Sequence, residues 1–441
     1  MEKDNKLPIH KLFLKYFLPQ LLSFFVISFY VVIDAAFVKK YVGVDALAGV
    51  NLAFPIMQFI IGISLMVGIG TSTVIGIELG KGDIKEASRV YSMMIFVSAI
   101  LSVLFMPLLN LISQVMYANS NVGPEVIEQA RVYSNILILT TPIWVVSQYF
   151  LSVARAIGKP MAASIVIITG NILNIIFDYI LLDKFNMGVE GAVIATGSSA
   201  AFVLIIGIFI VGNKRIKFTK FKLEAKRVWG ILYNGFSDLV AECSYGLTQL
   251  IFLYSVSIYA GKDGVVALGL INYLSNFLVL TIYGMAVSVQ PIISYNHGAN
   301  NAQKINEVKN FVLKWSTVIG TIFFVIMNVF IYDFVKLFGI VKVNIIELAI
   351  NAARLYAPLL ILVGYNSVYI SYYTAIEDAR TSAIFSILKG LIFVIIGIII
   401  LPGFLGLDGV WLTFLFSEVV TAVCIYFVNL TKKARLIVKN S

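Results

Sequence analysis

The stretch GVDALAGVN at 43–51 returns as GVVALGLIN at 264–272, at an offset of 221. Two further pairs follow in the same order at nearly the same offset: ARVY at 130–133 with ARLY at 353–356, and GVEGAVIAT at 188–196 with GLDGVWLTF at 406–414. Three ordered matches indicate that the chain contains two copies of one unit. The fold of one copy therefore predicts the fold of the other.

The composition places both copies in a membrane. Of the 441 residues, 60% are hydrophobic and only 13% are charged, whereas soluble domains carry about 25% charged residues. Segments of about 20 mostly apolar residues can cross a bilayer as helices. Twelve such segments are predicted: 16–38, 49–79, 90–116, 132–154, 161–182, 190–212, 230–260, 265–295, 309–337, 349–375, 382–401 and 407–430.

The repeat and the spans together define the architecture. The offset crosses six spans, an even number, so both halves have the same orientation in the membrane. Such parallel repeats pack around an axis along the membrane normal, with the substrate site between them. We expect an all-α polytopic membrane protein with twelve helices in two six-helix bundles around a central cavity. The N-terminal lobe is predicted over 1–213 and the C-terminal lobe over 230–441, joined by a basic linker at 214–229.

The basic residues orient the chain. The net charge is +10, but Lys and Arg gather in short loops between apolar runs, which is typical of membrane orientation and not of a nucleic-acid surface. The clusters are Lys3/Lys6/Lys11/Lys15, Lys81/Lys85/Arg89, Lys214/Arg215/Lys217/Lys220/Lys222/Lys226/Arg227 and Lys432/Lys433/Arg435/Lys439. All lie on one side of a twelve-span chain, although Lys39 and Lys40 lie on the other. The positive-inside rule predicts a multi-pass protein of the cell (inner) membrane with both termini cytoplasmic.

Four polar residues of the first half lie at similar depth in predicted spans. Asp34, Asp178 and Thr196 are roughly 6–9 Å inside the outer boundary at 1.5 Å per residue, and Asn174 is one turn deeper than Asp178. The equivalent positions of the second half, at offset 218, are Ile392, Ile396 and Phe414 for Asn174, Asp178 and Thr196. An all-oxygen site suits a hard cation such as Na⁺, and two neighbouring carboxyls suit proton exchange equally. The alternative is that Asp34 and Asp178 cap helix ends or face interfacial water. Tyr30, one turn before Asp34, is placed to donate a hydrogen bond to it.

The second half has its own intramembrane acid. Glu242 lies twelve residues into the seventh span, near mid-membrane, where an ionisable residue is a functional candidate by default. It suits attraction of an organic cation or coupling, or else a hydrogen-bonded packing role. Aromatic residues make up 13% of the chain, and an aromatic cavity would favour flat lipophilic cations.

Signs of an enzyme or an ATP-driven pump are missing from the sequence. GIELGK at 76–81 does not have the spacing of a phosphate-binding loop. The two histidines, His10 and His297, form no catalytic pair, and Cys243 and Cys424 define no disulfide framework or thiolate cluster. We therefore expect no enzymatic activity and no cofactor beyond a coupling ion.

The set of motifs VIDAAFV, GVDALAG, GKGD, GVEGAVIAT and QPIISYNHG resembles the multidrug and toxic compound extrusion (MATE) family over essentially the whole chain. The resemblance implies an inner-membrane antiporter that expels organic cations in exchange for Na⁺ or H⁺. It implies a first-half cation site at Asp34, Asn174, Asp178 and Thr196, and it includes Tyr30. Glu242 resembles the span-7 acid of some branches.

The sequence departs from the family pattern at three places. Lys39 replaces a usual glycine, Ser237 replaces a frequent proline, and residues 365–375 lack the acid that some branches pair with the span-7 glutamate. These departures favour coupling in the first half of the chain.

The predicted function is therefore cation-coupled multidrug efflux by alternating access, carried out by a monomer in lipid with small organic cations as substrates and without nucleic acid. Two alternatives remain. A lipid-linked oligosaccharide flippase of the same superfamily would need an Arg- and Lys-rich cavity, whereas the intramembrane charges here are mostly acidic. An ion channel would not require polar groups in one half only.

Overall fold

The computed structural model describes residues 2–120, 122–212, 216–337 and 342–440, and the side chains of all of these except residues 2, 3, 337 and 433–440. Within the described residues the regular elements are helical and no strand is present, as the sequence predicts. Some members of the predicted basic clusters lie outside the described side chains: Lys3, Lys214, Arg215, Lys433, Arg435 and Lys439.

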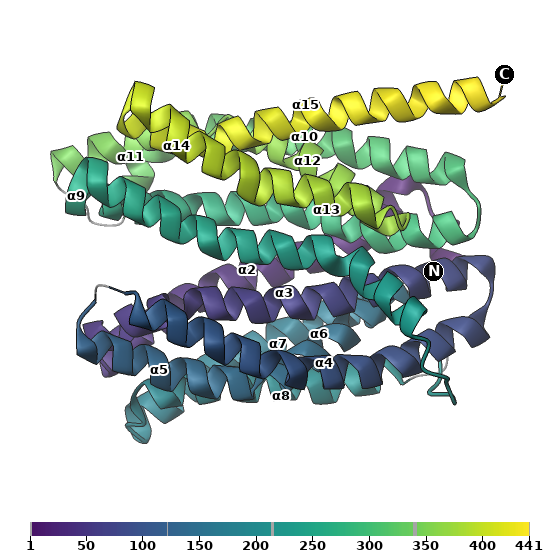
Figure 1. Cartoon of the computed structure of the whole chain (residues 1–441), viewed down its shortest axis with the longest axis horizontal. Coiled ribbons are helices and arrows are strands. Elements are labelled where there is room, and N and C mark those ends of the chain that lie inside the picture. The colour runs from purple at the N-terminus through teal and green to yellow at the C-terminus, as the bar shows by residue number, and fades with distance from the viewer. Residues whose placement is uncertain (1, 121, 213–215, 338–341, 441) are drawn as a thin grey trace.

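The first half of the chain forms one bundle, drawn in purple to blue in the lower part of Figure 1. After the short α1 (Glu2–Asn5), its elements are α2 (Ile9–Tyr41), α3 (Val44–Lys81), α4 (Ile84–Ala118), α5 (Pro124–Leu139), α6 (Thr141–Ala156), α7 (Pro160–Asp178), the π-helical η1 (Tyr179–Lys184) and α8 (Gly188–Val211). Each helix satisfies most of its backbone groups internally, which lipid requires of any segment that crosses it.

The second half forms the other bundle, which lies above the first in Figure 1. Its elements are α9 (Ala225–Gly298), α10 (Ala302–Leu337), α11 (Val343–Tyr356), α12 (Leu359–Ala375), α13 (Ala379–Ile387), the π-helical η2 (Leu388–Ile392), α14 (Phe393–Leu405) and α15 (Leu407–Asn440). The long α9 contains two spans that meet at Gly261, whose φ of 56° and ψ of −147° break the helix. Glycine tolerates this backbone conformation because it has no Cβ.

Two predicted spans are bent. The helices α5 and α6 meet at 52°, with Pro142 in the first turn of α6, and α11 and α12 meet at 44° beside Pro358. Proline removes one backbone donor and clashes with the preceding turn, which explains both bends. With each bent pair taken as one span and α9 as two, the described residues contain the twelve predicted crossings.

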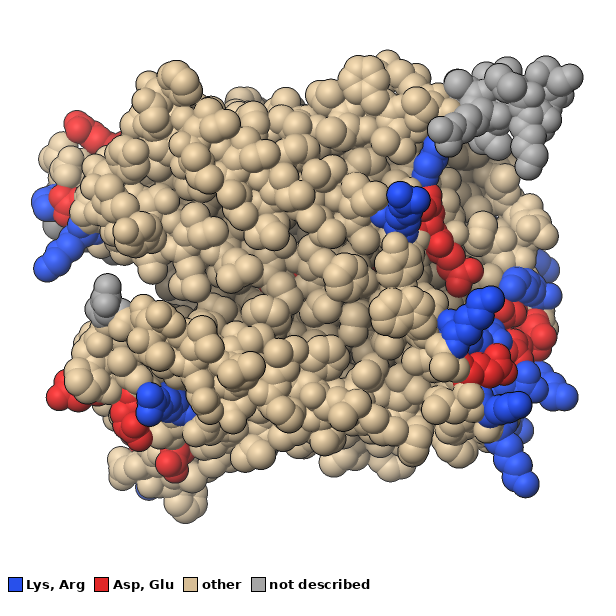
Figure 2. All heavy atoms as spheres, in the orientation of Figure 1, with Lys and Arg blue, Asp and Glu red and all other residues tan. Residues whose placement is uncertain are grey.

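The two bundles meet along α3 and α9, which pack against each other over much of their length. Both chain ends lie at the same end of the molecule, hereafter the terminal end (Figure 1). Figure 2 shows an uncharged belt between two charged ends, with Lys and Arg gathered at the terminal end. In the same view, the surface is hollowed between the bundles at the opposite end.

Candidate functional site

The structure brings the first-half polar residues together on three helices. Asp34 is in α2, Asn174 and Asp178 are in the last turns of α7, and Thr196 is in α8. The carboxyl groups of Asp34 and Asp178 lie close enough together to interact directly. Asp178, Asn174 and Thr196 are almost fully buried, with 0%, 1% and 3% of their surface exposed. Burial to this degree excludes the alternative that Asp178 faces interfacial water.

The amide of Asn174 links its two neighbours. In the orientation that satisfies both partners, its nitrogen donates to Asp178 Oδ2 at 3.1 Å and its oxygen accepts from the Thr196 backbone N–H at 3.2 Å. The Thr196 hydroxyl donates to the Ala192 carbonyl at 3.0 Å. One oxygen of Asp34 and one of Asp178 are buried without a hydrogen-bond partner among the described residues. These oxygens are available to a cation or a proton.

Two tyrosines complete this cluster. Tyr30 lies one turn before Asp34 and close enough to both carboxyls to interact with them electrostatically. Tyr133, in α5, is buried, approaches both carboxyls in the same way and lies close to the side chain of Thr196. Sequence reasoning missed Tyr133. The sequence does contain a hint of it, because Tyr133 ends the ARVY motif that matches ARLY, where Tyr356 is its counterpart. A residue present in both halves is interpreted as a packing residue, so Tyr133 is not included in the predicted site.

These groups form a site of two carboxyls supplemented by neutral oxygens. No three His, Cys, Asp or Glu side chains in the described part of the chain gather closely enough to hold a metal ion. Two carboxylates and neighbouring hydroxyls offer the hard oxygen ligands that alkali and alkaline-earth cations accept. Protonation of one carboxyl would also relieve the repulsion between the two groups, since two neighbouring carboxyls do not easily carry negative charge at the same time.

Glu242 lies at the interface between the bundles and not in the first-half cluster. Its Oε2 accepts a hydrogen bond from Gln58 Nε2 at 3.0 Å, which joins α9 to α3. Asp238, one turn earlier, and Tyr283 are close enough to interact with it electrostatically. The second-half acid is therefore placed where the two lobes face each other, where a shared substrate cavity is expected.

At the terminal end the bundles close on one another through glycine. A Cβ added to Gly235 in α9 would overlap the carbonyl oxygen of Met66 in α3, and one added to Gly298 would overlap that of Ile77. The turns that follow these helices, at Gly82 and Asn300, are 218 residues apart, which makes Gly80 the counterpart of Gly298 and Ile77 the counterpart of Tyr295. A Cβ added to Gly80 would likewise overlap the Tyr295 carbonyl, so the Gly80–Tyr295 and Gly298–Ile77 contacts are equivalent in the two halves and flank the pseudo-twofold axis.

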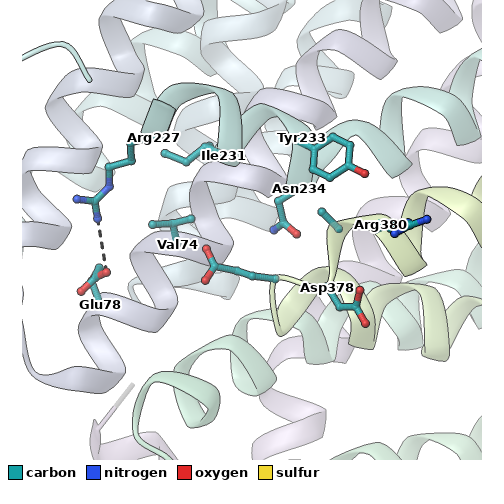
Figure 3. Close-up of a pocket in the computed structure, with 11 residues that line it drawn as sticks. Val74, Glu78, Arg227, Ile231, Tyr233, Asn234, Asp378 and Arg380 are labelled. Atoms are coloured by element: carbon teal, nitrogen blue, oxygen red, sulfur yellow. Dashed lines mark hydrogen bonds and ion pairs between the residues drawn. The ribbon is translucent and has the colours of Figure 1, made fainter. Parts of the chain in front are cut away.

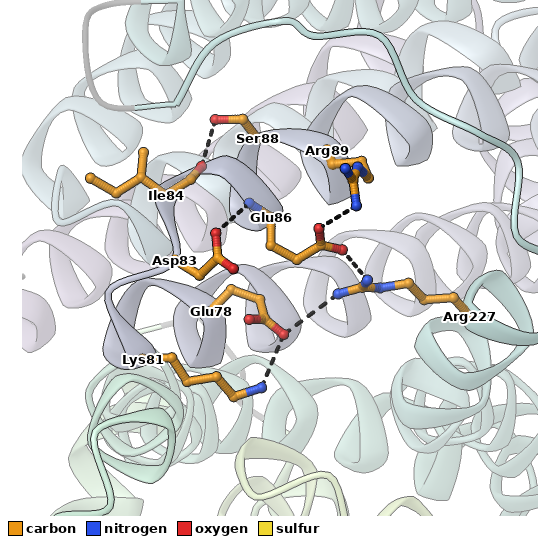
Figure 4. A network of polar contacts seen from close by, with 8 residues as sticks. All are labelled: Glu78, Lys81, Asp83, Ile84, Glu86, Ser88, Arg89 and Arg227. Atoms are coloured by element: carbon orange, nitrogen blue, oxygen red, sulfur yellow. Dashed lines mark hydrogen bonds and ion pairs between the residues drawn. The ribbon is translucent and has the colours of Figure 1, made fainter.

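Ion pairs reinforce this closed end, as Figure 4 shows. Arg227, in the first turn of α9, pairs with Glu86 of α4 and lies 3.5 Å from Glu78 of α3. Glu78 also pairs with Lys81 at 3.1 Å, and Glu86 pairs with Arg89 at 2.7 Å. Arg227 thus attaches the start of the second lobe to two helices of the first.

A cavity of about 460 Å³ lies beside this network (Figure 3). Its charged and amide-bearing lining residues are Glu78, Arg227, Asn234, Glu377, Asp378 and Arg380. Acidic and basic groups are mixed around it, and several already have partners within the protein, such as Glu78 with Arg227 and Asp378 with Lys432. The lining therefore favours neither an anion nor a cation.

The chain matches one known protein family over most of its length. The sequence model of the family described as MatE matches residues 19–180 and 239–399. The chain belongs to the MatE family. The two matched segments begin at positions 19 and 239, a spacing that agrees with the internal repeat. This match confirms the family resemblance predicted from the sequence motifs. The chain is a multi-pass membrane transporter and not an enzyme.

Relatives and solved structures of the MatE family cover the chain from end to end. "Multidrug export protein MepA" of Staphylococcus aureus (strain NCTC 8325 / PS 47) is 24% identical over 447 residues, which is 99% of this chain and 97% of the relative. MepA of Staphylococcus haemolyticus (strain JCSC1435) is 25% identical over 98% of this chain and 95% of the relative. The solved "outward-facing conformation of a multidrug resistance MATE family transporter of the MOP superfamily" has a TM-score of 0.90 and 22% identity, covering 100% of this chain and 98% of that one. The last comparison establishes the fold.

Proposed function

We propose that the chain is a multidrug efflux antiporter that exports lipophilic organic cations in exchange for Na⁺ or H⁺ by alternating access. The observation that carries this proposal is the cluster of Asp34 with the almost fully buried Asp178, Asn174 and Thr196. It lies in one half only of a twofold repeat, where packing alone would not require two carboxyls. The names of the curated relatives, multidrug export proteins, support the substrate class.

The arrangement of the lobes supports alternating access in a cell membrane. Glycine contacts and the Arg227 ion pairs close the terminal end, while the surface is hollowed between the lobes at the other (Figure 2). Lys and Arg gather at the terminal end, which the positive-inside rule makes cytoplasmic. We therefore assign this structure to an outward-open state with both termini in the cytoplasm.

Coupling would arise because ion and drug stabilise different states. A ligand that binds both states with equal affinity does not shift the equilibrium between them. Ion entry at Asp34 and Asp178 from outside would favour drug release, and its discharge into the cytoplasm would reset the transporter. One charge moving through 100 mV contributes about 2.3 kcal/mol, which corresponds to a concentration ratio of roughly 50.

Sodium is the ion that the donor set favours. Thr196 adjoins Asn174 beside the carboxyl pair, and the hydroxyl of Tyr133 lies close to both carboxyls. Neutral oxygens complete the coordination shell of a metal cation, whereas a proton carrier does not need them. A proton would use the same carboxyl pair, which keeps H⁺ as the alternative coupling ion.

Glu242 is proposed as the residue that attracts the drug. It lies at the lobe interface, and its partner Gln58 is neutral, so a cationic drug could replace this hydrogen bond with a stronger charged contact. Tyr245 and Tyr283 are neighbours that interact with it and add aromatic surface for cation–π contact. We propose that one chain, as a monomer in lipid, performs the cycle.

Transport in proteoliposomes tests this function. Purified protein would be reconstituted, and uptake of a fluorescent lipophilic cation followed under a sodium gradient at clamped pH and zero membrane potential. Uptake that follows the gradient and is lost in Asp178→Asn is the expected result. A response only to a pH gradient would make H⁺ the coupling ion, and a response to neither gradient would contradict antiport.

A further inference from the structure

A second buried charged group lies in the C-terminal lobe, where the sequence analysis placed no ion site. Lys389 Nζ lies 3.0 Å from Glu418 Oε1. Asn366 Nδ2 donates to Glu418 Oε2 at 2.5 Å and also to the Glu418 carbonyl at 2.9 Å. Glu418 has 6% of its surface exposed, and Asn366 has 0%. The ammonium of Lys389 therefore compensates the charge of Glu418, and the Asn366 amide hydrogen-bonds its other oxygen.

This pair lies deep in the membrane-spanning region. Glu418 is eleven residues from the start of α15 at Leu407, and Lys389 is ten residues from the start of α13 at Ala379. At 1.5 Å per residue each lies roughly 15 Å from the nearer helix end. A charge at this depth is costly unless it has a partner, so an ionisable pair here is a functional candidate.

The lysine is held by backbone geometry as well as by charge. It lies in the π-helical segment η2, and the hydroxyl of Ser417 donates to its carbonyl oxygen at 2.6 Å. Short π-helical segments inside α-helices occur frequently at functional sites. The Lys389 ammonium also lies 3.4 Å from Ser367 Oγ. Its surroundings thus consist of a carboxylate, an amide and hydroxyls.

The repeat relates this group to the first-half site. At offset 218, Lys389 corresponds to Asn171 and Glu418 to Ala200. Asn171 is about one turn from Asn174 on α7, and Ala200 is one turn from Thr196 on α8. The Lys389–Glu418 pair therefore occupies the counterparts of the same two helices, one turn nearer the terminal end.

We propose that Lys389 is a resident cation of the C-terminal lobe. Its ammonium fills an oxygen site made by Glu418, Asn366 and Ser367 that would otherwise bind a monovalent cation. Asn366 Oδ1, and Thr421 Oγ1 one turn after Glu418, are also buried without a hydrogen-bond partner among the described residues. The tethered ammonium cannot leave, so this lobe exchanges no ion during a transport cycle.

Thermal unfolding of the purified full chain tests this inference without any transport. The melting temperature is compared in equal concentrations of sodium chloride, methylammonium chloride and choline chloride, using variants built on Asp178→Asn. With Lys389→Ala added, Na⁺ or methylammonium should raise the melting temperature by at least about 2 °C over choline. Asp178→Asn alone, and the same protein with Lys389→Ala and Glu418→Gln together, should show no such difference.

The outcomes separate this inference from the proposed function. Equal melting temperatures of the Lys389→Ala protein in all three salts would overturn the inference, and so would a cation response that persists with Glu418→Gln. If Asp178→Asn alone still responds to Na⁺, the proposed first-half site fails, while the additional response caused by Lys389→Ala still decides the inference.

Poor accumulation of the Lys389→Ala protein would itself be informative. Breaking a buried ion pair by removing one partner is far more damaging than removing both. Recovery of the membrane yield to at least half of wild type on adding Glu418→Gln supports the pairing, and no recovery overturns it.

Discussion

The carboxyl groups of Asp34 on α2 and Asp178 on α7 lie close enough to interact directly, although the two residues are far apart in the sequence. Two carboxyls this close can share one proton through a hydrogen bond. Loss of that proton leaves two carboxylates that a cation can bridge. Proton and Na⁺ are therefore alternatives at one place, which is the basis of the proposed coupling.

Neutralising either carboxyl should abolish ion-driven efflux. We expect Asp34→Asn and Asp178→Asn to reduce the initial transport rate at least about 10-fold, because one lost charge interaction of about 1.4 kcal/mol already gives this factor. Expression should be retained, since a buried carboxyl is replaced by a neutral isostere. Asp183→Asn is the matched control, because Asp183 pairs with Lys184 outside the cluster. Near-normal efflux in Asp178→Asn would contradict the site assignment.

The neutral oxygens should determine which ion is used. Thr196→Val removes one hydroxyl, and we expect the sodium concentration for half-maximal transport to rise at least about 5-fold while a response to a pH gradient persists. Tyr133→Phe removes the hydroxyl that contacts Thr196 and should give a smaller change in the same direction. Dye transport under separate sodium and pH gradients measures both effects. Equal losses under the two gradients would show that these oxygens do not select the ion.

Glu242→Gln should weaken drug binding and leave ion binding intact. Because Glu242 contacts Gln58 across the lobe interface, its charge is expected to act on the drug. The KM for a cationic dye should rise about 5–50-fold, as expected for loss of a charged hydrogen bond of about 1–2.5 kcal/mol, and the KM for a neutral substrate should change little. Loss of Na⁺ binding in this variant would instead assign Glu242 to coupling.

Closure of the terminal end should depend on close backbone contact. Gly298→Ala places a methyl group against the carbonyl of Ile77, so the outward-open state should be disfavoured and a cysteine placed at the terminal end should react faster with a membrane-impermeant maleimide. Gly269→Ala is the control, because Gly269 lies in the same helix with no neighbour near its missing Cβ. Equal labelling of the two variants would show that the contact does not hold this end closed.

The pair between Asp378 and Lys432 predicts a pH effect on stability. Burial raises the pKa of Asp378, but hydrogen bonds from Lys432 and Thr381 outweigh it and hold the pKa below its usual value. The pair therefore stabilises the folded state above the usual pKa of about 4, and this contribution disappears as pH falls through the lowered value. The melting temperature of wild type should exceed that of Asp378→Asn at pH 6, and the difference should shrink below about pH 4. A difference that grows on acidification would contradict this assignment.

Most of the fold follows from sequence because lipid imposes a simple rule. Each crossing must be a long apolar helix, so hydropathy alone predicts twelve of them, and the repeat predicts their common orientation. Pro142 and Pro358 can be recognised in the sequence as places where a helix bends. The angle of each bend, however, depends on how the neighbouring helices pack. The break at Gly261 within α9 likewise could not be read from hydropathy, which predicts only a short connection between the spans 230–260 and 265–295.

The first-half site was predictable because the two halves differ there. Asp34, Asn174, Asp178 and Thr196 were identified as polar residues without counterparts, and depth along each helix brought them together. Tyr133 escaped this reasoning because the repeat conserves a tyrosine at its counterpart. The Lys389–Glu418 pair escaped it because the partners lie on different helices, and the rotation of each helix within a bundle cannot be read from hydropathy.

Direct binding of ²²Na⁺ to the purified protein at fixed pH tests the central claim most directly. Wild type should bind Na⁺ in competition with protons, so that the apparent Kd rises as pH falls. Asp178→Asn should lose at least about 10-fold in affinity, while Asp183→Asn should bind as wild type does. Sodium binding that is unchanged in Asp178→Asn would contradict a cation site at the Asp34–Asp178 pair.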